Sequence, residues 1–316
     1  MYYVGIDLGG TNIAAGIVDE NGIIVKKGSV PTGRERNAEA IIADMAALVE
    51  KLLNELNLKE SDIHSIGIGS PGSLDREKGV IIYANNLNFR HVPVRELIQK
   101  KFNLPVYVEN DANCAAIAES VAGAAKDAGD SIVITIGTGI GGGIIVGRKL
   151  YTGFNGAGAE LGHMVVQIGG EACTCGRKGC WEAYSSATAL IEMTKKAAKA
   201  NPDSQIVSLV GGDLSKIDAK TAFDAARLED ETGKAVIDNY LDILAEALAN
   251  MINIFQPQVL AIGGGVSKEG ENLLGPLRKR LEGLTYCADG VPQTSLVAAK
   301  MGNDAGIIGA AFITKA

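Results

Sequence analysis

Two short segments of the sequence repeat one pattern, in which a β-rich run enters a turn of glycine and threonine and leaves as a second β-rich run. The first segment is residues 6–13 and the second is residues 133–140, an offset of 127 positions. Glycine turns between such runs are typical of β-hairpins. Two equivalent hairpins, each heading its own block of strands and helices, predict a duplicated α/β architecture.

The spacing of apolar residues along the chain predicts alternating strands and helices. Strands are expected at residues 2–8, 13–18, 23–29, 63–69, 106–109, 131–137, 144–146 and 259–262. Helices are expected at residues 37–56, 94–102, 112–122, 188–200, 221–226, 234–255 and 305–314. This order predicts an α/β fold, and a chain of 316 residues is long enough to divide into two domains.

Composition and charge exclude several classes of protein. Apolar residues make up 47% of the chain and charged residues 21%, which excludes intrinsic disorder. The net charge of −7 argues against a nucleic-acid partner, because such partners bind basic surfaces. The longest uncharged run, residues 131–147, is shorter than the roughly 20 residues of a membrane helix. Asp7 interrupts the only apolar stretch near the start, so we expect no secretory signal, no membrane partner and a cytoplasmic protein.

Glycine is over-represented: the chain has 40 among 316 residues, whereas an average usage of about 7% would give about 22. Most of the excess falls in a few segments, at residues 9–10, 67–72, 137–143, 153–162, 169–179 and 263–265. Glycine loses much conformational entropy on folding, so a purely structural role for so many is unfavourable. We expect these segments to contact ligands.

The first hairpin places Asp7 at a strand end beside Gly9, Gly10 and Thr11. Glycine lets backbone N–H groups approach a phosphate, a threonine hydroxyl adds a donor, and a carboxylate there can hold Mg²⁺ through water. An ordinary hairpin turn is the alternative. The second hairpin repeats the pattern at residues 137–143, and two such loops predict a nucleotide held between two domains.

Four of the five residues at 109–113 are polar, and they lie where a predicted strand leads into a predicted helix. A helix N-cap needs only one such residue. Asn110 and Asp111 would lie at the carboxyl end of the strand, where α/β sheets bind ligands. Asp111 is therefore a candidate general base that accepts a proton from a hydroxyl attacking a phosphate.

Four potential metal ligands cluster in the sequence: His163, Cys173, Cys175 and Cys180. In a reducing compartment a Cys₃His set favours tetrahedral Zn²⁺, and four protein ligands leave no open position, so the site would be structural. Unrelated free thiols are the alternative. Cys114 and Cys287 have no neighbouring ligands and are predicted to be core thiols.

With these motifs the sequence resembles the ROK family, bacterial sugar kinases and related repressors of the actin/hexokinase-like ATPase superfamily. Five segments carry the resemblance, in family order, at residues 7–12, 137–143, 160–163, 173–180 and 263–267. They span nearly the whole chain, and the His-plus-Cys₃ set is the most specific of them. Within the family the sequence is most similar to the bacterial glucokinases.

The resemblance implies two actin-like (ribonuclease H-like) lobes with a nucleotide and sugar cleft between them. The smaller lobe would comprise residues 1–111 with a C-terminal helix at 303–316. The larger lobe would comprise residues 112–302 and carry the zinc loop. The resemblance also implies a homodimer or homotetramer.

The resemblance further implies the residues of the site. Those implied for the nucleotide are Asp7, Gly9, Gly10, Thr11, Asn12, Thr138, Gly139, Gly264 and Gly265. Those implied for the sugar are Gly72, Asn110, Asp111, Glu160, His163 and Glu182. Asp111 would act on the 6-hydroxyl, and His163 would serve both the zinc and the sugar. Many members have lysine at the position of Asn12, which leaves the phosphoryl donor open between ATP, ADP and polyphosphate.

The implied activity is that of an ATP- and Mg²⁺-dependent glucokinase, which phosphorylates the 6-hydroxyl of glucose. A ROK kinase for N-acetylglucosamine, N-acetylmannosamine, mannose or fructose stays open, because no feature of the sequence separates these sugars. A sugar-sensing repressor of the same family is a further alternative. Such repressors carry an N-terminal helix-turn-helix, whereas this sequence begins directly with a predicted strand at Tyr2.

Overall fold

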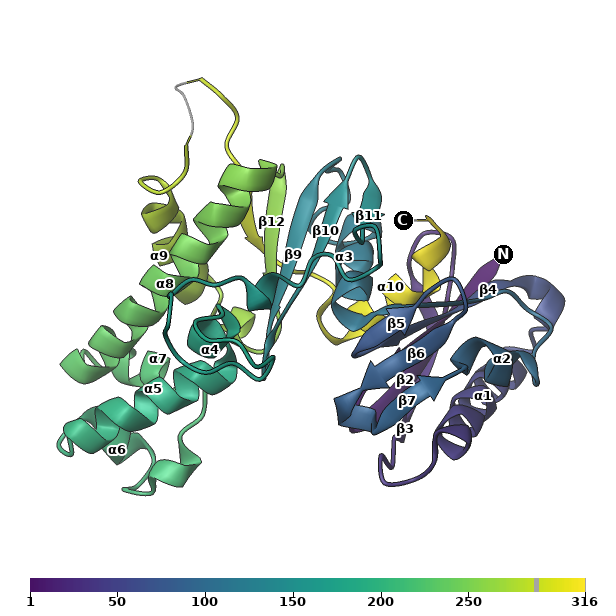
Figure 1. Ribbon diagram of the computed structural model, residues 1–316, viewed down its shortest axis with the longest axis horizontal. Coiled ribbons are helices and arrows are strands. Elements are labelled where there is room, and N and C mark those ends of the chain that lie inside the picture. The colour runs from purple at the N-terminus through teal and green to yellow at the C-terminus, as the bar shows by residue number, and fades with distance from the viewer. Residues whose placement is uncertain (287–289, 316) are drawn as a thin grey trace. The chain divides into compact units, whose positions relative to one another are not determined.

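The computed structural model describes residues 1–286 and 290–315 of the chain (Figure 1). Its strands are β1 (Tyr2–Leu8), β2 (Asn12–Val18), β3 (Ile24–Pro31), β4 (Ile63–Ser70), β5 (Ser73–Asp75), β6 (Val80–Ala84), β7 (Phe89–Val92), β8 (Val106–Asn110), β9 (Ser131–Ile136), β10 (Ile140–Val146), β11 (Lys149–Tyr151), β12 (Val259–Gly263) and β13 (Ser295–Ala298). Its α-helices are α1 (Ala38–Glu55), α2 (Val94–Gln99), α3 (Asp111–Val121), α4 (Glu182–Ser185), α5 (Ala187–Ala200), α6 (Gln205–Leu209), α7 (Thr221–Arg227), α8 (Glu231–Phe255), α9 (Glu271–Leu281) and α10 (Ala305–Ala311). Short 3₁₀ helices lie at Glu60–Asp62, Asn85–Leu87, Leu161–His163, Leu214–Lys216, Val266–Glu269, Gly302–Asp304 and Ile313–Lys315. Cys287, predicted to be a core thiol, lies outside the described residues.

The chain divides into two compact units. Unit 1 comprises residues 1–133, 143–159 and 300–316, and unit 2 comprises residues 134–142 and 160–299. The divisions fall within β9 and β10, before residue 160, and after β13. The two functional lobes expected at 1–111 with 303–316 and at 112–302 stay a prediction.

Two five-stranded sheets share one topology. The first has the order β3-β2-β1-β4-β8, in which β1 is antiparallel to β2 and parallel to β4. The second has the order β11-β10-β9-β12-β13, with an antiparallel β10–β11 pair and a parallel β12–β13 pair. The β1–β2 and β9–β10 hairpins therefore hold equivalent positions, and the α/β architecture predicted from the internal repeat is confirmed. A three-stranded sheet, β5-β6-β7, was not predicted.

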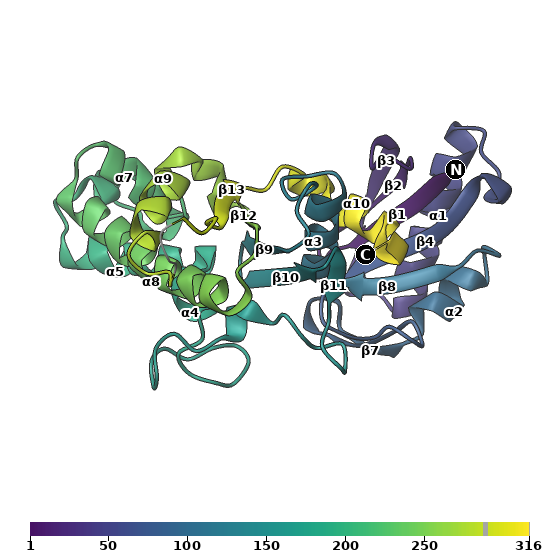
Figure 2. The ribbon, with the colours of Figure 1, turned by 90° about the horizontal axis from the view of Figure 1, so that it is seen from above.

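Helices cover both faces of the first sheet because side chains alternate along β1. Val4, Ile6 and Leu8 are buried in one core with α1 and α2. Tyr3 lies on the other face and packs in a second cluster with residues of α3 and α10. Asp7 shares the face of Tyr3 by the same alternation, so it points toward the α3 and α10 side. Figures 1 and 2 show α3 and α10 side by side, although they lie far apart in the sequence.

α10 approaches the sheet and α3 so closely that side chains are excluded at two glycines. A Cβ atom at Gly67 would overlap the carbonyl oxygen of Ala310, and one at Gly309 would overlap the carbonyl oxygen of Cys114. Gly67, which lies in a segment expected to contact ligands, is therefore a packing residue. Cys114 is fully buried, as predicted for a core thiol, and burial raises its pKa well above the ordinary value.

The interior of unit 2 is organised around α8, the long green helix of Figure 1. Its residues Leu241, Leu244 and Leu248 recur at helical spacing and are buried. Tyr240 is fully buried as well, and its hydroxyl donates to the carbonyl oxygen of Ser185 at 2.9 Å, which ties α8 to the end of α4. Among the described helices, none is long and apolar enough to cross a membrane.

Candidate active site

Asp7 lies near the carboxyl end of β1 and faces the first turn of α10. The backbone approach is tight, because a Cβ atom at Gly306 would collide with the Asp7 carboxylate. Burial, and after it the negative charge of Asp111, raises the pKa of Asp7 to about 6. The structure thus brings together the residue predicted to serve Mg²⁺ and the residue predicted to be the base.

Asp111 is the first residue of α3, and Asn110 is its N-cap. The Asn110 side-chain oxygen accepts from the N–H groups of Ala112, at 2.9 Å, and Asn113, at 3.2 Å. The N-cap role is therefore filled by Asn110, and Oδ1 of Asp111 also accepts from the N–H of Ala112, at 2.9 Å. Although Asp111 keeps a solvent-exposed edge, the protein around its carboxyl raises its pKa by burial, against hydrogen bonds from Ala112 and Asn110. A raised pKa brings a carboxylate closer to the value of an effective base near neutral pH.

Glu109, two residues before Asp111, forms an ion pair with Arg76. The guanidinium of Arg76 donates to both oxygens of Glu109 at 2.6 Å, and the Glu109 side chain is only 3% exposed. Glu109 also accepts from the backbone N–H of Asn110 at 2.7 Å and from the Asn113 side chain at 2.9 Å. The pair thus fixes the strand-to-helix junction that carries Asn110 and Asp111. Glu109 is one of the four polar residues at 109–113, whereas no pattern in the sequence points to Arg76.

Gly72 immediately precedes β5. Its φ of +96° favours glycine, and a Cβ atom there would overlap the carbonyl oxygen of Tyr83 in β6. These two constraints explain why the position is glycine. Its predicted contact with a sugar stays a prediction.

In unit 2 the second glycine turn is held by side chains of neighbouring segments. The carbonyl oxygen of Thr138 accepts from the Thr188 hydroxyl at 2.8 Å, at the start of α5. The Glu182 carboxylate accepts from the N–H of Ile140 at 2.9 Å, and a Cβ atom at Gly139 would collide with it. The structure therefore brings Thr138, Gly139 and Glu182 together.

The turn that carries Glu160 and His163 packs on the same strand start. A Cβ atom at Gly162 would overlap the carbonyl oxygen of Ile140. Glycine is therefore needed between Glu160 and His163, the two candidate sugar-binding residues of this turn. The N–H of His163 donates to the carbonyl oxygen of Glu160 at 3.1 Å, which closes a 3₁₀ turn. The turn that carries Glu160 and His163 and the carboxylate of Glu182 thus both lie against Ile140, the first residue of β10.

The four predicted zinc ligands converge. The ligand atoms of His163, Cys173, Cys175 and Cys180 all lie within 4.8 Å of one another. The Sγ of Cys173 is 3.6 Å from Nδ1 of His163, and the Sγ atoms of Cys175 and Cys180 are 3.7 Å apart. A tetrahedral zinc with its usual bond lengths requires about 3.6 Å for a sulfur–nitrogen pair and about 3.8 Å for a sulfur–sulfur pair. The four residues therefore fit Zn²⁺ in their chemistry, and these two pairs already have the spacing that a bound zinc requires.

The third glycine segment follows β12. Gly264 has a φ of +86°, and a Cβ atom there would overlap the carbonyl oxygen of Ile136. At Gly265, by contrast, a Cβ atom would meet open space. Packing against β9 therefore explains Gly264, and only Gly265 keeps an open position at the end of the strand. That adenosine lies near these residues stays a prediction.

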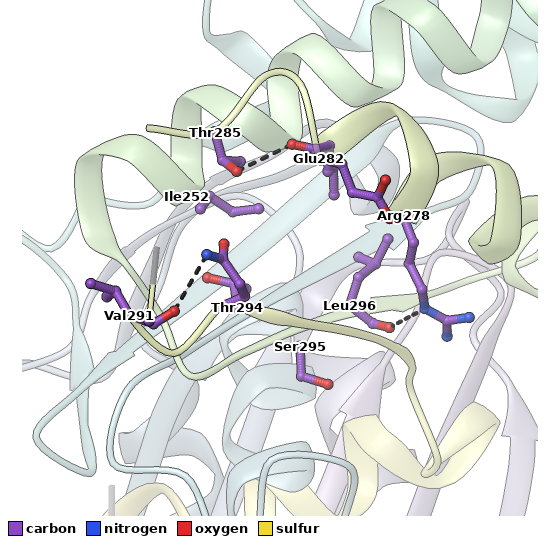
Figure 3. Close-up of a pocket in the computed structure, with 11 residues that line it drawn as sticks. Ile252, Arg278, Glu282, Thr285, Val291, Thr294, Ser295 and Leu296 are labelled. Atoms are coloured by element: carbon purple, nitrogen blue, oxygen red, sulfur yellow. Dashed lines mark hydrogen bonds between the residues drawn. The ribbon is translucent and has the colours of Figure 1, made fainter. Parts of the chain in front are cut away.

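A separate pocket of about 690 Å³ lies on unit 2 among α8, α9 and β13 (Figure 3). Its described lining includes Ile252, Arg278, Thr285 and Leu296, but none of the candidate site residues. The guanidinium of Arg278 donates to the carbonyl oxygen of Leu296 at 3.0 Å and to Glu271 at 2.7 Å. Its charge is therefore already paired, and the pocket gives no support to the predicted chemistry.

The raised pKa of Asp7 predicts a pH-dependent stability. The folded chain binds more protons than the unfolded chain between the ordinary pKa of 3.8 and about 6, so this carboxyl destabilises the fold increasingly as the pH rises through that window. Asp7→Asn cannot ionise. We expect it to be more stable than the native chain by about 1–3 kcal/mol at pH 7, and by much less at pH 4. Urea unfolding of both proteins at each pH, without Mg²⁺ or nucleotide, measures this; an equal difference at both pH values contradicts it.

The chain is similar to known proteins along nearly its whole length. A model of the ROK family matches residues 3–316. A glucokinase of Thermotoga maritima is 40% identical over 314 residues, covering 99% of this chain and 96% of that protein. The crystal structure of a ROK family glucokinase from Streptomyces griseus, in complex with glucose and AMPPNP, is similar with a TM-score of 0.81 at 37% identity, covering 98% of both chains. A xylose repressor of Caldicellulosiruptor bescii is 31% identical over 285 residues, covering 90% of this chain and 71% of the repressor.

Proposed function

The chain belongs to the ROK family, and from this premise we propose that it is a glucokinase that transfers the γ-phosphate of ATP to the 6-hydroxyl of glucose. One observation carries the proposal: relatives named glucokinase match nearly the whole chain and nearly their own whole length, at 40% identity for the Thermotoga maritima protein. The related structure that holds glucose with AMPPNP supports a sugar and an adenine nucleotide as the ligands.

Asp111 is the proposed base. It accepts the proton of the 6-hydroxyl while the oxygen attacks the γ-phosphorus, the new O–P bond forms, and the bond to the β-phosphate oxygen breaks to release ADP. Its raised pKa and its position at the start of α3 support this role. Asn110 caps the helix and thereby fixes where Asp111 points.

The phosphates are proposed to bind at the glycine turns. In unit 1 these are Gly9, Gly10, Thr11 and Asn12, with Asp7 holding Mg²⁺ through water. Mg²⁺, when bound, neutralises phosphate charge during transfer. In unit 2 the proposed nucleotide residues are Thr138, Gly139, Gly264 and Gly265.

The remaining sugar contacts are proposed for Gly72 and Asn110 in unit 1, and for Glu160, His163 and Glu182 in unit 2. With Nδ1 of His163 on the zinc side, its Nε2 stays free for a sugar hydroxyl. Zinc ligation fixes the tautomer and the ring orientation of a histidine. We assign the zinc a structural role, because four protein ligands complete its coordination.

A coupled assay with a panel of sugars tests the activity. ADP formation is followed with glucose, mannose, fructose, N-acetylglucosamine and N-acetylmannosamine, and glucose phosphorylation is repeated with polyphosphate in place of ATP. We expect the highest kcat/KM for glucose with ATP. A higher kcat/KM for another sugar would replace glucose as the substrate but keep the kinase chemistry.

The repressor alternative has one observation in its favour, the 31% identity to a xylose repressor. That match leaves more than a quarter of the repressor uncovered, whereas it leaves only a few per cent of the glucokinase uncovered. Sugar binding without any ADP formation would favour the repressor class. We also propose that the protein is cytoplasmic and forms a homodimer or a homotetramer. Light scattering, which measures the mass of the assembly in solution, tests the oligomeric state.

A further inference from the structure

Thr32, the residue after β3, is wholly buried against the first glycine turn. Its hydroxyl donates to the carbonyl oxygen of Gly9 at 2.7 Å, and its backbone N–H donates to the carbonyl oxygen of Thr11 at 2.9 Å. The turn is closed internally by the N–H of Gly9, which donates to the carbonyl oxygen of Asn12 at 3.1 Å. One threonine therefore holds two of the carbonyl groups of the turn.

The hydrogen bond from Thr32 to the carbonyl oxygen of Gly9 also fixes the direction of a neighbouring N–H group. In a trans peptide the carbonyl oxygen and the next N–H point in opposite directions. When Thr32 holds the carbonyl of Gly9, the N–H of Gly10 must point away from Thr32. Within the described part of the chain, the N–H groups of Gly10 and Thr11 have no hydrogen-bond partner, and Thr11 is exposed. The turn thus presents the unpaired N–H of Gly10 on the side opposite Thr32, and the unpaired N–H of Thr11 follows it in the chain.

The position of Thr32 follows from the hairpin. The β2–β3 ladder ends with Asn12 opposite Pro31. Hydrogen-bonded and non-hydrogen-bonded pairs alternate in an antiparallel ladder, so the next N–H that faces the turn is that of Thr32. Thr32 supplies the next N–H and adds a hydroxyl, so that it grips the turn on both sides of Gly10. Because both bonds are made from a buried side, they do not compete with a ligand on the open side.

We propose that Thr32 is a positioning residue for the nucleotide: it holds the Gly9–Gly10 peptide so that the N–H of Gly10 faces the phosphates before the nucleotide binds. This inference rests on the proposed function, since it takes the turn to be a phosphate site. A preorganised donor loses less conformational freedom on binding than a free one. The hydroxyl of Thr32 therefore acts on nucleotide affinity and not on the sugar.

Two substitutions separate positioning from general packing. Thr32→Val keeps the size and β-branching but removes the hydroxyl, whereas Thr32→Ser keeps the hydroxyl. We expect Thr32→Val to raise the KM for Mg·ATP about five- to tenfold, with the KM for glucose changed less than twofold. Thr32→Ser should stay within about twofold of the native value for both. If Thr32→Val does not fold, Thr32→Ala takes its place in the same comparison.

A matched control is available in unit 2. The hydroxyl of Thr294 donates to the carbonyl oxygen of Pro257 at 2.7 Å, the same kind of bond away from the candidate site residues. Thr294→Val should leave both KM values unchanged. A Thr32→Val protein with a native KM for Mg·ATP, or with both KM values raised alike, overturns the inference.

Calorimetric titration with Mg·AMPPNP keeps this test apart from the proposed function. Native protein that phosphorylates no hexose removes the proposed function. Weaker AMPPNP binding by Thr32→Val than by Thr32→Ser supports the positioning role in either case. Equal AMPPNP binding by the two variants removes that role.

Discussion

Replacing Asp111 by asparagine is expected to lower kcat with glucose by about 10²–10⁴-fold, the usual effect of losing a positioned general base. The KM for glucose should change little, because asparagine keeps the size and one carbonyl oxygen of the side chain. The fold should also be kept, since the N-cap of α3 is made by Asn110 and not by Asp111. The measurement is a steady-state assay of both proteins across a range of glucose concentrations.

The pH profile adds an independent check on Asp111. Burial raises the pKa of this carboxyl, so the native kcat should fall on the acidic side as the base becomes protonated. The Asp111→Asn variant has no such group, and its acidic limb should move to lower pH, because losing the Asp111 charge also lowers the pKa of Asp7. Asp213→Asn, which changes an exposed carboxylate at another short helix, is the control and should leave kcat unchanged. Near-native turnover of Asp111→Asn would refute the base assignment.

The elements that could be predicted contain, within their own few residues, the local pattern that identifies them. The expected strand at residues 2–8 is β1 (Tyr2–Leu8), because β-rich residues there end at a glycine turn. The expected helix at residues 37–56 is α1 (Ala38–Glu55), and Asn37, a favoured residue type at that position, is its N-cap. Local composition is sufficient in such cases, because the cap or turn that ends the element lies within the same few residues.

Among the elements that were not predicted, α9 and the β5-β6-β7 sheet were missed for opposite reasons. α9 contains Gly275 and Pro276, which are unfavourable inside helices, yet its apolar residues Leu273, Leu277 and Leu281 are buried on one face. Tertiary packing there outweighs local propensity. The β5-β6-β7 sheet has strands of only three to five residues, which give too short a pattern to recognise.

The candidate site divides in the same way. Asp111 and the Cys₃His set were identified because residue type and spacing along the chain were enough. Arg76 and Thr32 were not, because their partners lie 33 and 23 positions away and no local pattern announces them. Gly67 shows the converse error, since a glycine count could not distinguish a ligand loop from a close helix contact.

Loss of the zinc is expected to unfold the segment between His163 and α4. Apart from two isolated bridges, Val165 with Cys180 and Ala172 with Lys178, its described residues form no sheet or helix that would hold it. Structural zinc sites contribute directly to folding energy, so a short irregular loop depends on its metal. Cys173→Ser should reduce the zinc content from about one per chain to near zero, measured by elemental analysis.

The consequences for activity and for local order can be measured separately. Arg177 and Lys178 are exposed in the loop, and we expect trypsin to cut there much faster in Cys173→Ser than in the native protein. Because His163 and Glu182 flank the loop, kcat/KM for glucose should fall at least about tenfold, the lower end of the effect of losing support around a metal site.

The control for the zinc prediction is Cys114→Ala, which removes a thiol that is buried in unit 1 and lies outside the cluster. It should keep the zinc and the trypsin resistance of the loop, even if its overall stability falls. Zinc-free native protein with full activity would contradict a structural metal. Equal zinc loss in both cysteine variants would instead show that unfolding of the chain, and not removal of one ligand, releases the metal.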